Sequence, residues 1–148
     1  MNARIALLAA ALAFPMAAQA YCIHNQLRDR DVLVEQVGMK DKLREDRILR
    51  KTLKPGERYC CQNLDCNPGG RPESVVDLLL VIPGDPVYWC GHAEGSNVVK
   101  VTGDGNIRVM HNPRHPKISV KYIARIRSGQ KDMTGPAGLA CREPRKGK

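Results

Sequence analysis

The sequence predicts an all-β fold, a single small antiparallel β-sandwich or barrel of about seven to nine short strands, stapled by disulfides and followed by a flexible C-terminal tail. Short apolar or alternating segments recur along the chain, and turn-forming glycine and proline clusters separate them. The chain also contains six cysteines. An even number of cysteines behind an export signal predicts disulfide bonds.

The first 20 residues have the pattern of a secretory signal peptide. Arg4 supplies the positive start, an apolar run follows, and Ala18-Gln19-Ala20 fits a cleavage site after Ala20. The apolar run is too short to span a bilayer, and no other segment is long and apolar enough to do so. We therefore expect a periplasmic or secreted protein with one disulfide-linked β domain at 21–141 and a basic tail at 142–148.

The expected strands follow one another at short intervals. They cover residues 21–25, 31–37, 47–53, 57–62, 75–82, 87–90, 97–102, 106–110 and 118–127. Residues 40–51 are ambiguous, and we interpret them as a charged hairpin arm or loop that leads into the third strand. The most apolar segment, 75–82, is expected to be a central strand that is covered on both faces. Gly103-Asp104-Gly105 predicts a hairpin between 97–102 and 106–110.

Residues 118–127 show the cleanest alternation in the chain. One face carries the apolar side chains of Ile118, Val120, Tyr122, Ala124 and Ile126. The other face carries mainly polar ones: Ser119, Lys121, Ile123, Arg125 and Arg127. The first face is expected to pack in the core and the second to face solvent.

The cysteines are unevenly distributed. Cys60, Cys61 and Cys66 form a cluster, whereas Cys22, Cys90 and Cys141 stand far from it. Because adjacent residues of a strand point to opposite faces, Cys60 and Cys61 should bond to different partners. We expect the cluster to tie both ends of the mature chain to its middle, with the pairing left open. A zinc site is the alternative, but no second pair of ligands at suitable spacing completes it.

Positive charge gathers in the last third of the chain. The formal net charge is +9, and the excess of Lys and Arg over Asp and Glu lies after Val99. The expected anion-binding residues are Arg108, Arg114, Lys117, Lys121, Arg125 and Arg127. The alternative is a solvated face that keeps the protein soluble. Aromatic residues are only 4% of the chain, too few for the stacking that single-stranded nucleic acid needs, so nucleic acid is not the expected partner.

Signals for catalysis are absent from the sequence. There is no nucleophile elbow, no phosphate-binding glycine loop and no C-x-x-C redox pair. Asp77 lies inside an apolar segment and is a candidate acid, although such residues more often bond to neighbouring groups. We expect no cofactor.

The preferred interpretation is an exported, non-catalytic binding or structural module whose partner is an anionic polymer or an acidic protein outside the cytoplasm. The alternative is a secreted metal-binding protein or enzyme that uses His92, His111 and His115. Pro113 lies between His111 and His115 and Pro116 follows directly, which excludes a helical metal pair, so a loop would have to bring these imidazoles together.

Overall fold

The structure is a computed structural model that describes residues 21–38, 43, 48–61, 64–91 and 97–144. Eleven strands and no helix are found in these ranges. The strands are β1 (Cys22–Asn25), β2 (Val32–Gln36), β3 (Arg50–Leu53), β4 (Arg58–Cys60), β5 (Val75–Ile82), β6 (Tyr88–Cys90), β7 (Val98–Thr102), β8 (Gly105–His111), β9 (Tyr122–Ser128), β10 (Lys131–Asp132) and β11 (Leu139–Arg142). The expected signal peptide, His92 and residues 145–148 of the expected tail lie outside the described ranges.

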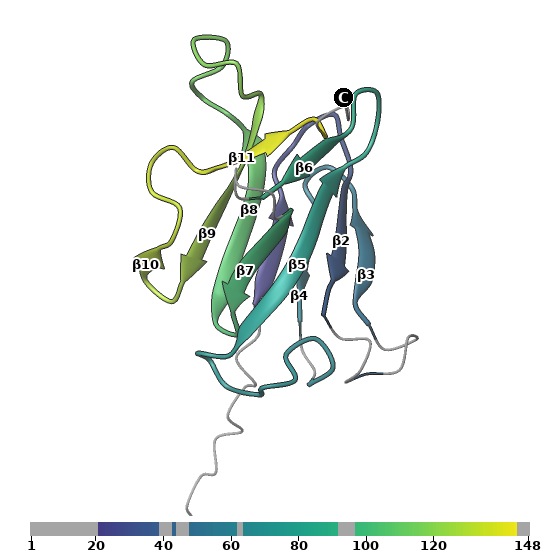
Figure 1. Cartoon of the computed structure of the whole chain (residues 1–148), viewed down its shortest axis with the longest axis vertical. Helices are drawn as coiled ribbons and strands as arrows, with labels where there is room; N and C mark the ends of the chain where they lie inside the picture. Colours follow the sequence, from purple (N-terminus) through teal and green to yellow (C-terminus); the bar gives the residue numbers. More distant parts are fainter. Residues whose placement is uncertain (1–20, 39–42, 44–47, 62–63, 92–96, 145–148) are drawn as a thin grey trace, which may run out of the picture.

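All the strands belong to one sheet that curls into a nearly closed barrel (Figure 1). The strand order is β3-β2-β5-β6-β11-β9-β8-β1-β4, with β7 also on β5 and β10 on β9. The long strand β5 is flanked by β2 on one edge, and on the other edge by β7 along its first half and β6 along its second. Strand β11 joins the two halves of the barrel because it pairs with β6 on one side and β9 on the other.

The all-β, disulfide-stapled fold is therefore confirmed, but the strand number and one pairing differ from the expectation. The two additional strands, β10 and β11, follow Ser128, where the sequence loses its alternation. Both are short, and their place is set by backbone pairing with β9 and β6 rather than by a hydrophobic pattern. The sheet is also not purely antiparallel, because β1 and β8 run parallel.

The core lies inside the barrel and follows the predicted alternation. In β1 and β8 every second side chain is buried, including Ile23, Ile107 and Val109. Strand β5 is covered on both faces only in its second half, where Leu80, Val81 and Ile82 are all buried. In the first half of β5, Asp77 lies opposite Lys100 of β7 and forms a surface ion pair with it at 2.9 Å. The Asp77 carboxylate thus has a structural partner.

The hairpin predicted around Gly103 is wrong. Strand β7 pairs with β5, whereas β8 pairs with β1 and β9. The turn between them is held by a different part of the chain, since the Gly103 amide donates to Ser74 O at 2.9 Å and the Asp104 amide to Pro72 O at 3.2 Å. The chain therefore crosses from one half of the barrel to the other at this turn.

The predicted strand at 118–127 begins later than expected. Strand β9 starts at Tyr122, and residues 112–121 form a loop that projects from one end of the barrel (Figure 1). The Asn112 side chain holds this loop, because its Nδ2 donates to Val120 O at 2.8 Å and its Oδ1 accepts from the Arg114 amide at 3.0 Å. Ile118, expected in the core, is 40% exposed. The inward face of Tyr122, Ala124 and Ile126 is confirmed.

Three disulfides staple the fold: Cys22–Cys60, Cys61–Cys66 and Cys90–Cys141. Cys60 and Cys61 bond to different partners, as predicted. The expectation that the cluster ties both chain ends to the middle is wrong for the C-terminal side, because Cys141 bonds to Cys90. The reason is strand pairing, since Cys90 and Cys141 stand opposite each other on β6 and β11.

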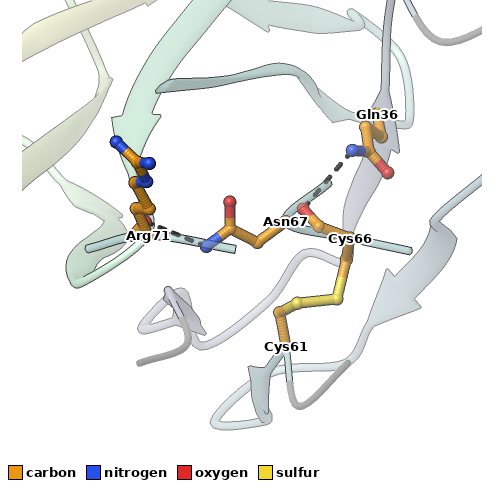
Figure 2. The surroundings of a disulfide bond; sticks show 5 residues. All are labelled: Gln36, Cys61, Cys66, Asn67 and Arg71. Atoms are coloured by element: carbon orange, nitrogen blue, oxygen red, sulfur yellow. Dashed lines mark hydrogen bonds between the residues drawn. A yellow bond between two sulfur atoms is a disulfide. The ribbon is translucent and has the colours of Figure 1, made fainter. Parts of the chain in front are cut away.

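The Cys61–Cys66 bridge lies beside the core (Figure 2). Gln36 is buried, and its Nε2 donates to Cys66 O at 3.3 Å, so the bridge is fastened to the end of β2. The neighbouring Asn67 donates to Arg71 O at 3.2 Å. A Cβ added at Gly103 would clash with Arg71 O and Asn67 Nδ2. The segment from Asn67 to Arg71, which follows the bridge, therefore packs closely against the turn after β7.

Candidate anion-binding surface

The pairing of β8 with β9 places three of the predicted arginines together. Arg108 stands opposite Arg125, and Asn106 stands opposite Arg127. Opposed residues of an antiparallel pair project to the same face, with Cβ atoms about 4.5–5.5 Å apart. The intervening residues Ile107 and Ile126 are buried. Their arginine neighbours consequently lie on the outer face of the sheet.

These side chains border a cavity of about 190 Å³, which we call the arginine cavity. Its lining residues are Asn106, Arg108, Arg125, Arg127 and Asp132. Asp132 belongs to β10, where it stands opposite Arg127, and it borders the cavity from that strand. Three guanidinium groups against one carboxylate give the cavity a net positive charge.

The three arginines differ in how firmly they are held. Arg125 is half-buried, and its Nη2 donates to Pro136 O at 2.9 Å. Arg127 is exposed, and its Nη2 donates to Gln130 O at 3.2 Å. Arg108 is exposed and has no hydrogen bond or ion pair to any other described residue. Its guanidinium is thus available to an external acceptor.

Two polar atoms at the cavity have no partner among the described residues. Asn106 Oδ1 and Arg125 Nε are both buried and form no hydrogen bond there. Buried polar groups in folded proteins are nearly always satisfied by protein, water or ligand. The Arg125 Nε–H, which borders the same cavity as the Arg108 guanidinium, is thus a donor without an acceptor in the described part of the chain.

The single carboxylate of the cavity is held in its charged form. The pKa of Asp132 is lowered, first because its Oδ1 accepts a hydrogen bond from the Thr134 amide at 2.9 Å. The Thr134 hydroxyl, the Gly135 amide and the charge of Arg125 lower it further. Asp132 therefore shapes the turn after β10 and lies at one side of the arginines without pairing with Arg108.

The outer face continues onto β1 and β4. His24 of β1 is in register with Arg108 on one side and with Arg58 of β4 on the other. The sequence interpretation missed both residues because they lie far from the basic last third. Alternation places His24 on the same face as Cys22, and a Cys22–Cys60 bridge would have brought Arg58 beside it. That pairing was not decided by the sequence.

The other three predicted anion-binding residues lie elsewhere. Lys121 borders a separate cavity of about 250 Å³ with Tyr88, Arg142 and Glu143, and its Nζ lies 5.2 Å from the centre of the Tyr122 ring. Arg114 and Lys117 are exposed on the projecting loop. The structure therefore brings together three of the six predicted residues and separates the rest.

The histidines do not assemble a metal site within the described residues. His111 Nε2 lies 3.2 Å from Asp29 Oδ1, and its ring also contacts Tyr122 with centroids 5.2 Å apart. His115 lies on the exposed loop, and His92 is outside the described ranges. No group of three His, Cys, Asp or Glu side chains in the described part of the chain is arranged to hold a metal ion.

No protein-family model, curated protein or solved structure matches this chain. No helix that is long and apolar enough to cross a membrane occurs in the described ranges.

Proposed function

We propose that this chain is an exported, non-catalytic binding module. Outside the cytoplasm it binds an anionic component in the arginine cavity. The observation that carries the proposal is the convergence of Arg108, Arg125 and Arg127 on one cavity in which Arg108 has no partner among the described residues. A guanidinium donates several hydrogen bonds in a fixed planar geometry that matches carboxylate and phosphate oxygens. Two guanidinium groups that project from opposed strand positions, such as Arg108 and Arg125, can bind a single oxyanion.

The location of the arginines favours binding over a merely solvated face. A basic surface that serves solubility normally has charges of both signs interspersed. Here the one acid, Asp132, is occupied by the Thr134 and Gly135 amides. No acid in the described ranges compensates the charge of the Arg108 guanidinium, so an external anion is the partner that would balance it.

Export is supported by the signal-like first 20 residues and by the three disulfides. Disulfides persist in oxidising compartments such as the periplasm or the cell exterior. The expected partners are therefore anionic components of the envelope or of the surrounding medium. The secreted metal protein or enzyme remains the alternative, and no observation on the described residues favours it.

The test is retention of the mature domain on a heparin or polyphosphate column with a salt gradient. The test variant is the Arg108→Gln, Arg127→Gln double substitution, and the control is Arg114→Gln with Lys117→Gln on the projecting loop. The two variants lose the same charge. Each lost contact with a polyanion should reduce the slope of log affinity against log salt by about 0.7–0.9.

We expect the Arg108→Gln, Arg127→Gln variant to elute at clearly lower salt than the wild type. The loop control should elute at nearly the same salt concentration as the wild type. Both variants should melt near the wild type, because exposed charges contribute roughly 0–1 kcal/mol to stability. A wild type that passes through the column at low salt would mean that the basic surface is only a solvated face.

A further inference from the structure

We infer that the arginine cavity is one end of an elongated site, and that its ligand is a linear phosphate polymer lying across β9, β8, β1 and β4. This inference rests on the proposed function and adds the shape and chemical class of the ligand. It starts from the register of the four strands, which places Arg125, Arg108, His24 and Arg58 in one row on the outer face.

The row has a defined length. Neighbouring strands of a sheet lie about 4.8 Å apart, so four strands span about 14 Å from Arg125 to Arg58. One oxyanion covers the Arg125 and Arg108 positions but does not reach Arg58 two strands further on. A ligand that contacts the whole row must therefore carry repeated anionic groups along a chain.

The members of the row are open to such a ligand. Arg108 has no partner among the described residues, and Arg58 is exposed, with its Nη2 at 3.3 Å from Cys22 Sγ, a weak acceptor. His24 is half-buried, and its Nδ1 lies 3.4 Å from Gln26 Nε2. The Cys22–Cys60 bridge joins β1 to β4 two residues along each strand from this row, so the Arg58 end is fixed relative to the cavity.

The face is also free of acids along this path. The outward residues of β4, β1 and β8 are Arg58, Cys60, Cys22, His24, Asn106, Arg108 and Met110. None of them is Asp or Glu. Asp132, on β10, stands beside Arg127 and next to the row's Arg125 end. A chain of negative groups thus meets no repulsion between Arg108 and Arg58.

The same outward residues indicate which chemical features of the ligand the face can recognise. No Phe, Tyr or Trp lies among these outward residues, so the described part of the face lacks the large aromatic side chains on which successive bases or sugar rings usually stack. Recognition rests on charge and on guanidinium hydrogen bonds. Phosphate has more acceptor oxygens than carboxylate and suits the opposed pair Arg108 and Arg125. A chain of phosphates without bases is the class that fits.

The test compares orthophosphate, tripolyphosphate and long-chain polyphosphate by calorimetry at low salt, with the acidic polysaccharide alginate as the comparison polymer. We expect affinity to rise with chain length until the polymer spans the row and then to level off. Arg58→Gln should weaken binding of long polyphosphate about threefold to fivefold, as expected for one exposed ionic contact, and leave orthophosphate binding unchanged. Arg108→Gln should weaken both. The matched control is Arg28→Gln, an exposed arginine outside the row.

The outcomes separate this inference from the proposed function. If Arg58→Gln binds long polyphosphate like the wild type while Arg108→Gln does not, the site is compact and the elongated row is overturned. If alginate binds and polyphosphate does not, the phosphate class is overturned and anion binding stands. If none of the four probes binds, the elongated site and the proposed function both fail.

Discussion

Tyr21 is the first described residue, and its ring is completely buried in the core. Its phenolic oxygen is buried without a hydrogen-bond partner among the described residues. The pKa of Tyr21 is raised, chiefly because burial disfavours the phenolate and secondly because Tyr59 lies near. An unpaired buried hydroxyl costs about 1–3 kcal/mol. The apolar ring of Tyr21 therefore stabilises the core, whereas its unpaired hydroxyl lowers the stability of the fold.

We predict that Tyr21→Phe raises the free energy of unfolding at pH 7 by about 1 kcal/mol. The pKa of Tyr21 in the folded protein lies above its unfolded value near 10, so the unfolded chain loses the phenol proton first. The free energy of unfolding of the wild type is therefore unaffected by this group below about pH 10 and falls as pH rises above it. The variant should lose less stability than the wild type between pH 9 and pH 11. Urea unfolding at a series of pH values measures both effects. A variant less stable than the wild type at pH 7 would show that the hydroxyl has a stabilising partner.

The acid at the arginine cavity gives a second prediction. Asp132→Asn keeps a side-chain oxygen for the Thr134 and Gly135 amides but removes the negative charge beside the arginines. We expect polyanion affinity to rise about twofold to fivefold at neutral pH, the size of one exposed charge interaction. For the same reason the wild type should bind more tightly as pH falls through the lowered pKa of Asp132. Titration of wild type and variant over a series of pH values from 7 into the acid range checks this, and equal affinities at pH 7 would contradict it.

At the scale of the strands, position could be predicted from the sequence and partners could not. Each of the nine expected segments overlaps an observed strand, because alternation and turn residues are local properties. The hairpin at Gly103 failed because the turn is bonded to Pro72 and Ser74, which no local pattern indicates. The strand expected at 118–127 begins too early in the sequence, because Ile118 and Val120 continue the alternating pattern into a loop.

The candidate site shows the same limit. Alternation placed Lys121, Arg125 and Arg127 on one face, and this holds for the two arginines at the cavity. Arg58 and His24 could not be assigned to that face, because their place depends on the parallel β1–β8 pair and on which cysteine bonds to Cys22. A functional surface assembled from four strands is a long-range property of the fold.

The three disulfides should contribute unequally to stability. Cys22–Cys60 and Cys90–Cys141 join residues 38 and 51 positions apart, whereas Cys61 and Cys66 are 5 apart. Loop-closure entropy gives about 4 kcal/mol for each long loop and about 2 kcal/mol for the short one. We predict that replacing both cysteines of a pair by serine follows this order in denaturant unfolding. Equal losses for all three pairs would mean that packing around Gln36, rather than loop length, sets the value of the short bridge.

For the molecule as a whole, we predict that the exported protein begins at Tyr21 and contains no free thiol. All six cysteines are bridged in the structure, and the Tyr21 carbonyl accepts a hydrogen bond from the Cys61 amide at 2.9 Å. The intact mass of the exported protein should match residues 21–148 with three disulfides, and an alkylating agent should add no mass before reduction. Labelling of the unreduced protein, or an N-terminus elsewhere, would contradict this.

The parallel pairing of β1 with β8 bears on how the protein reaches its native state. Strand β1 is the first strand of the described part of the chain, yet its parallel partner β8 follows only after six intervening strands. Contacts between distant residues slow folding because the intervening chain must be ordered before they form. During synthesis or refolding, β1 therefore lacks this neighbour until residues 105–111 are available to pair with it. Refolding of the disulfide-intact protein should accordingly fall in the range of milliseconds to seconds that is typical of non-local β topologies.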